Sequence, residues 1–269
     1  KFGAEGLNYC AIEYVGSAVE AMEIDDRMTL CNHAAELGAK AALLEADGKT
    51  LAWLKAHGAK TPAPLSADAD AHYADRFEID TLQLAPQVAR KHAVDDIVSA
   101  HEVIGQKINF ALIGTCTNGR LDDIRQAAAV LKGKRVAKGV RMIITPASRQ
   151  IYLAAAREGL IEALTEAGAS VEAAGCGTCV GITNHLIPGD REVVISSANR
   201  NFQGRLGNHD SDIWLGSAAT VAATSEPISG ISSSPSKSSG IADVVRPVAA
   251  SSSSDQVRFA TSSHSVPAA

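Results

Sequence analysis

Three cysteines lie in glycine-containing stretches that are typical of ligand-binding loops. Cys116 lies in IGTCTNGR, and Cys176 and Cys179 form a C-x-x-C pair in GCGTCVG. A structural zinc site needs four ligands, and His185, as a fourth, would give an unusual C-x-x-C-x5-H spacing. A thioredoxin-like pair would not need Cys116. Three thiolates without a fourth favour a [4Fe–4S] cluster with one open iron, with zinc and metal-free cysteines as the alternatives.

The other two cysteines, Cys10 and Cys31, are expected to be small buried side chains. The total of five cysteines is odd, which argues against a secreted disulfide framework and indicates a reducing compartment.

Strands and helices alternate in the second part of the chain, which predicts a mostly parallel sheet with helices on both faces. The cysteine loops and a third loop, SSANRNFQGR, all follow predicted strands. Ligands gather at the carboxyl ends of such strands, so the three loops could meet in one crevice. Strands are predicted at residues 108–114, 140–146, 169–175 and 191–197, and helices at 120–133, 148–159 (with Ser148 as its N-cap) and 160–168.

The first part of the chain is expected to form a separate α/β domain. The spacing of Ile12, Val15, Val19 and Met22 predicts a helix over residues 11–23. A helix at 28–38 ended by Gly38, a buried strand at 39–47 and a helix at 48–58 follow. A stretch rich in Pro, Ala and Asp then places a domain boundary near residue 75.

Composition narrows the class of protein. The chain of 269 residues has a formal net charge of −5, so nothing indicates a nucleic-acid-binding surface. No apolar run approaches membrane-spanning length, and no signal peptide opens the chain. Residues 229–269 are rich in serine and poor in large apolar side chains, which predicts a disordered tail.

Several motifs, in order, strongly resemble the aconitase superfamily, and above all the large subunits of 3-isopropylmalate dehydratase and homoaconitase. They are IGTCTNGRLDDIRQAA, GCGTCVG and SSANRNFQGRLG, with MTLCNHAAELGAKAALLEAD, LAPQVA and LKGKRVAKGVRMIITPASRQIY. The resemblance covers residues 6–225. It implies aconitase-like three-layer α/β/α domains with mostly parallel sheets: part of one domain at 1–75, its N-terminal portion missing, and a cluster-binding domain at 76–228.

The resemblance also implies roles for individual residues. Three cysteines would hold the [4Fe–4S] cluster, arginines would bind substrate carboxylate through their forked donors, and a glutamate would handle a proton. Amides would form hydrogen bonds around the cluster. The matching residues are Cys116, Cys176 and Cys179 for the metal, Arg200 and Arg205 for substrate, Glu36 for catalysis, and Asn32, Asn118 and Asn199 for the cluster environment.

The implied activity is that of a hydro-lyase that moves a hydroxyl between neighbouring carbons of a hydroxy-di- or tricarboxylate by dehydration and rehydration. The expected reaction converts 2-isopropylmalate to 3-isopropylmalate in leucine biosynthesis, with homoaconitate, dimethylmalate or aconitate as alternative substrates. The expected partner is a small, swivelling-domain subunit, in the cytoplasm, with no nucleic acid or membrane involved. Without its partner and an upstream domain, the chain is expected to be inactive. A non-catalytic iron–sulfur or zinc-binding relative remains the competing hypothesis.

Overall fold

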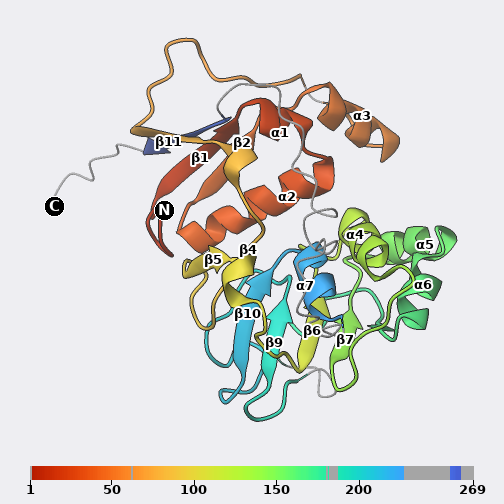
Figure 1. Cartoon of the computed structure of the whole chain (residues 1–269). Helices are drawn as coiled ribbons and strands as arrows, with labels where there is room; N and C mark the ends of the chain where they lie inside the picture. The colour runs from red at the N-terminus through yellow and green to blue at the C-terminus, as the bar shows by residue number, and fades with distance from the viewer. Residues whose placement is uncertain (1, 62, 180, 182–186, 227–254, 262–269) are drawn as a thin grey trace. The chain divides into compact units, whose positions relative to one another are not determined.

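A computed structural model describes residues 2–61, 63–179, 181, 187–226 and 255–261 of the chain (Figure 1). The chain divides into two compact units. Unit 1 comprises Lys1–Leu84 together with Pro247–Ala269, and unit 2 comprises Ala85–Arg246. Each unit has its own sheet, and each is described here by itself.

Unit 1 is built on a four-stranded sheet of order β2-β1-β11-β3. Strands β1 and β2 are parallel, whereas β11 runs antiparallel to both of its neighbours, β1 and β3. A core of Leu7, Ile12, Tyr14 and Ala34 packs with Phe2 and Phe77, whose rings meet edge to face. The elements are β1 (Cys10–Val15), α1 (Ser17–Ala21), α2 (Ile24–His33), the 3-10 helix η1 (Ala34–Leu37), β2 (Ala41–Leu44), α3 (Gly48–Ala56), β3 (Asp75–Ile79), η2 (Thr81–Gln83) and β11 (Asp255–Thr261).

The helix predicted over residues 11–23 is wrong, because its first half is strand β1. Ile12 and Tyr14 are buried at alternate positions, which is the period of a strand. Gly16, with a φ of 117°, separates the strand from the short helix α1. Two flanking strands pair with β1, so long-range pairing overrides a helical spacing that rested on only four apolar residues.

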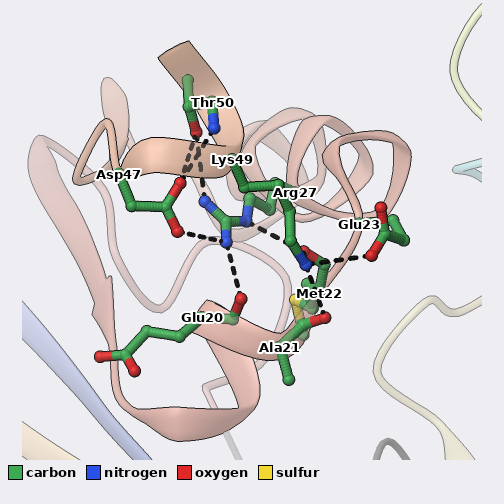
Figure 2. A network of polar contacts seen from close by, with 8 residues as sticks. All are labelled: Glu20, Ala21, Met22, Glu23, Arg27, Asp47, Lys49 and Thr50. Atoms are coloured by element: carbon green, nitrogen blue, oxygen red, sulfur yellow. Dashed lines mark hydrogen bonds and ion pairs between the residues drawn. The ribbon is translucent and has the colours of Figure 1, made fainter. Parts of the chain in front are cut away.

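Arg27 organises the junction between α1, α2 and α3 (Figure 2). Its buried guanidinium donates to the carbonyl oxygens of Glu20 and Met22, to Thr50 Oγ1 and to Asp47 Oδ2 at 2.7 Å. Asp47 also accepts from the Thr50 N–H as the N-cap of α3. The network therefore satisfies carbonyl groups at the end of α1 while it anchors the start of α3.

The boundary and the tail differ from the sequence expectation. Strand β3 pairs with β11, so unit 1 extends to Leu84 rather than ending near residue 75. Residues Asp255–Thr261, expected to be disordered with the rest of 229–269, form β11. The composition predicted that the entropy lost on ordering this segment would keep it disordered. Pairing of its backbone with two neighbouring strands offsets that loss. Residues 227–254 and 262–269 lie outside the described residues.

Unit 2 contains a seven-stranded sheet of order β5-β4-β10-β9-β6-β7-β8. The five strands from β10 to β8 are parallel, and β4 and β5 add an antiparallel edge. The α/β, mostly parallel fold class is confirmed. The elements are β4 (Gln87–Ala89), β5 (Ile97–Ser99), η3 (Ala100–Val103), β6 (Phe110–Ile113), α4 (Leu121–Leu131), β7 (Arg141–Ile144), α5 (Arg149–Arg157), α6 (Leu160–Glu166), β8 (Ser170–Val171), β9 (Val193–Ser196), β10 (Asp212–Gly216) and α7 (Ala218–Thr224).

The four helices described in unit 2 all contribute to one core cluster, on one face of the sheet. That cluster joins Ile124, Ala155, Leu164 and Val221, one from each helix, to alternate residues of β6, β7 and β9; Figure 1 shows α4, α5 and α6 side by side. The opposite face carries a smaller cluster that includes Leu206 from the connection between β9 and β10. In a parallel sheet, right-handed connections that lead to the next strand in one direction lie on one face, and those that lead in the other direction lie on the opposite face. The described β9–β10 connection contains no helix, and Leu206 from it packs on this second face.

No helix within the described ranges combines the length and the hydropathy that spanning a membrane requires.

Candidate functional site

The strand order places a switch point between β6 and β9. The chain passes from β6 to β7 on one side, whereas it passes from β9 to β10 on the other. Connections that diverge in this way leave a crevice at the carboxyl ends of the two strands. The first cysteine loop follows β6, and the arginine-containing loop follows β9.

The loop that carries Cys116 is packed against the end of β7. The N–H of Ala147 donates to the carbonyl oxygen of Gly119, and a Cβ on Gly114 or Gly119 would overlap the carbonyl oxygen of Thr145. Gly114 also has a φ of 90°, which a residue with a side chain rarely adopts. Glycine at both positions thus lets the backbone approach closely while the Cys116 side chain stays exposed.

The C-x-x-C loop packs against the same segment. The N–H of Gly175 donates to the carbonyl oxygen of Pro146, and Gly177, with a φ of 53°, lies against the side chain of Thr145. A turn in which the Cys179 N–H donates to the Cys176 carbonyl oxygen at 3.1 Å brings the two cysteines onto one short loop. The two cysteine loops therefore pack against the same residues, those that follow β7.

The loop after β9 contacts both cysteine loops. The amide nitrogen of buried Asn118 donates to the Ser197 carbonyl oxygen at 2.5 Å and to Asn199 Oδ1 at 3.3 Å. The Gly114 N–H donates to Ser197 Oγ at 2.9 Å. Arg205 Nη2 lies 3.0 Å from Cys179 Sγ. The three loops predicted to converge thus do meet at one edge of the sheet.

Glycine also makes the contact between the C-x-x-C loop and the loop after β9. Gly181 (φ 66°) and Gly207 (φ 93°) face one another, and a Cβ on Gly181 would overlap the Gly207 backbone nitrogen. A close backbone contact of this kind holds Arg205 beside Cys179.

The three thiols form a chemically suitable donor set for an iron–sulfur cluster. All are free, Cys116 and Cys176 are exposed and Cys179 is half-buried, so each could exchange its proton for a metal. Within the described residues, no three or more His, Cys, Asp or Glu side chains are close enough together to hold a metal ion.

Three further predicted site residues lie within the described part of the chain. Arg200 is exposed on the loop after β9. Asn32, exposed, and Glu36, half-buried on η1, belong to unit 1, so their part in the site stays a prediction. His185 lies outside the described residues. Burial lowers the pKa of His33, an effect that the nearby Glu36 opposes, in keeping with a packing role for this histidine.

Sequence inspection missed three residues that position the loops. Thr145 supports both cysteine loops, and Ser197 binds the first of them. Asn201, fully buried, donates to the carbonyl oxygens of Arg90 and Ala93 and so ties the β4–β5 turn to the loop after β9. For Thr145 and Ser197 the available signal was their place immediately after strands β7 and β9, and for Asn201 it was its place within SSANRNFQGR.

Comparison with known proteins identifies the family. The family model described as the aconitase family (aconitate hydratase) matches residues 1–107 and 92–226. The chain belongs to the aconitase family.

Curated members of the family are 40–48% identical to the chain over the residues that match. The 3-isopropylmalate dehydratase large subunit of Elusimicrobium minutum is 48% identical over 221 residues, 82% of this chain and 53% of that protein. The 3-isopropylmalate dehydratase large subunit 2 of Archaeoglobus fulgidus is 44% identical over 82% of this chain and 53% of its own length. A probable methanogen homoaconitase large subunit of Methanosarcina mazei is 45% identical over 83% of this chain and 56% of its own length. The chain thus spans about half the length of these relatives.

Proposed function

We propose that this chain provides the cluster-binding part of a hydro-lyase large subunit that isomerises a hydroxy-di- or tricarboxylate, with 2-isopropylmalate as substrate. The observation that carries the proposal is the convergence of the Cys116 loop, the C-x-x-C loop and the loop after β9 at one switch point. The names of the aconitase-family relatives support the reaction class.

In this proposal Cys116, Cys176 and Cys179 hold a [4Fe–4S] cluster with one open iron. When bound, the cluster supplies Lewis-acid chemistry at an oxygen of the substrate. Three protein ligands leave one iron for that purpose, and family members are generally iron–sulfur enzymes.

The remaining residues bind substrate, order the loops or move a proton. Arg200 is exposed and therefore accessible to a carboxylate, which a guanidinium binds through two donors. Arg205, beside Cys179, would place a second cation next to the cluster. Asn118 and Asn199 hold the first cysteine loop against the loop after β9. Glu36 would exchange a proton with the substrate, and Asn32, four residues earlier, would form hydrogen bonds around the cluster.

The partner and the setting belong to the same proposal. The relatives are named as large subunits, so we propose a small subunit as the partner that completes the active site, in the cytoplasm. Homoaconitate is the second candidate substrate, because two relatives that span a similar share of this chain are named probable methanogen homoaconitase large subunits.

The first test is anaerobic reconstitution of the chain with iron and sulfide. We expect about four irons and four sulfides per chain with broad visible absorption. Cys116→Ala should lose most of the iron, whereas the matched control Cys10→Ala, in unit 1, should keep it. Bound zinc without visible absorption, or equal iron in both variants, would contradict the cluster assignment and favour a degenerate relative.

The second test is activity. The reconstituted chain is combined with a small subunit, and with a large subunit of the length of the relatives as a positive control. Hydration and dehydration of 2-isopropylmalate and homoaconitate are then followed. The proposed reaction is supported if the full-length large subunit turns over a substrate and loses this activity when the cysteine that matches Cys116 is replaced. It is contradicted if the cluster is loaded and neither substrate is turned over.

A further inference from the structure

Strand β11 occupies an interior position in the sheet of unit 1. It pairs with β1 from Cys10–Thr261 to Val15–Gln256 and with β3 from Asp75–Phe259 to Ile79–Asp255. Among the described strands, β3 pairs with no strand except β11. The strand from the end of the chain is therefore the link that joins β3 to the rest of the sheet.

The register places the apolar positions of β11 beside core residues. Val257 stands opposite Tyr14 on one side and opposite Phe77 on the other, and both of these belong to the unit 1 core. Phe259 stands opposite Ile12, which is fully buried. Val257 and Phe259 alternate with Gln256 and Arg258 in the sequence, the period of a strand with one apolar face.

This strand lies beyond the residues that the family model matches. The family model's match ends at residue 226, and β11 begins at Asp255. Strand β11, which lies beyond the family match, thus completes a sheet whose other strands, β1, β2 and β3, lie within that match.

We propose that Asp255–Thr261 is an intramolecular donor strand, and that the facing edges of β1 and β3 form an acceptor site for an extended segment of this alternating pattern. Without β11, the N–H and C=O groups of β1 that face it would form an open sheet edge, a template for pairing with other chains. Occupation of that edge by the chain's own segment satisfies these groups and places Val257 between Tyr14 and Phe77 in the register of the sheet.

Hydrogen exchange read by mass spectrometry on the full chain tests the proposal. Val257→Pro removes an N–H from a strand that is paired on both sides, whereas the control Val257→Thr keeps the N–H and the β-branched shape. We expect exchange in β1 and β3 to become about tenfold faster or more in the proline variant, with β6 and β9 of unit 2 unchanged. Equal exchange in β1 and β3 in both variants would overturn the proposal.

A second arm supplies the strand separately. In a chain that ends at Ser254, exchange in β1 and β3 should be fast, and a synthetic peptide of the sequence DQVRFAT should slow it, whereas the same peptide with proline in place of its valine should not. Failure of the DQVRFAT peptide to protect β1 overturns the acceptor site. Light scattering of the full chain should show a monomer; a dimer that dissociates in the Val257→Pro variant would show that a second copy donates the strand, against the intramolecular form.

Discussion

Asp47 carries a charge that stabilises the junction of helices in unit 1. It accepts a hydrogen bond from the buried Arg27 guanidinium and caps α3. The Arg27 hydrogen bond is the main cause that holds the Asp47 pKa well below its usual range. A carboxyl group with a depressed pKa in the folded state adds stability above its unfolded pKa of about 3.9, and that stability is lost as the pH falls.

Asp47→Asn should therefore destabilise unit 1 by about 1 kcal/mol at pH 7. This is less than for a fully buried charged pair, because water partly screens the exposed carboxylate. Asparagine remains a good N-cap, so the change isolates the charge. Urea unfolding at pH 7 and at pH 3 measures the difference, which should shrink at the lower pH. The matched control, Glu158→Gln, breaks the exposed pair with Arg125 and should have no measurable effect. A cost of the same size at both pH values would contradict the role of the charge.

Asn118 gives a prediction for the site. Its amide nitrogen donates to two oxygens, and an aspartate there would face both with acceptors only. We expect Asn118→Asp to destabilise unit 2 by about 2–3 kcal/mol and to lower iron uptake. Urea unfolding and iron content measure the two effects. Asn208→Ala, which removes a partly exposed amide on the β9–β10 connection, is the control; an equal cost in both variants would argue against a special role for Asn118.

At the scale of elements, close packing between loops depends on glycine. Gly181 and Gly133 both have positive φ, but only Gly181 meets a neighbouring backbone, whereas Gly133 faces open space. An alanine at either position carries conformational strain of about 1 kcal/mol. At Gly181 it must also displace Gly207.

Gly181→Ala should consequently cost about 1–3 kcal/mol more than Gly133→Ala. It should also weaken cluster binding, because the contact that keeps Arg205 beside Cys179 would open. Chemical unfolding and iron content of the two variants test this. Equal stability in both would show that the loops can separate without cost.

The elements also show where sequence patterns succeed. Helix α4 has its amphipathic pattern and α5 its Ser148 cap, as predicted, because local spacing and capping determine both. Strands β3, β4, β5, β10 and β11 were not predicted. Short strands of this kind depend on their partners; for example, Asp75–Ile79 has little local signal and is held by β11.

At the scale of the whole molecule, two units with separate cores should unfold separately. The chain has two tryptophans, Trp53 in unit 1 and Trp214 in unit 2. In the Trp214→Phe variant, fluorescence of Trp53 should report the unfolding of unit 1. In the Trp53→Phe variant, fluorescence of Trp214 should report the unfolding of unit 2, with a different midpoint. Asp47→Asn should shift only the Trp53 transition, and Gly181→Ala only that of Trp214. A single transition that moves with either substitution would show that the units unfold as one.

The sequence by itself determined the family and the mostly parallel sheet of unit 2, and it singled out the three cysteines that we propose as cluster ligands. These depend on the residue types at fixed spacings, and spacings are local. Only the tertiary structure decided that Thr145 and Ser197 support the cysteine loops, that unit 1 extends to Leu84, and that Asp255–Thr261 lies between β1 and β3. Each of these joins residues far apart in the chain. Pairing and close packing between distant segments depend on which partner is present, and no local pattern specifies the partner.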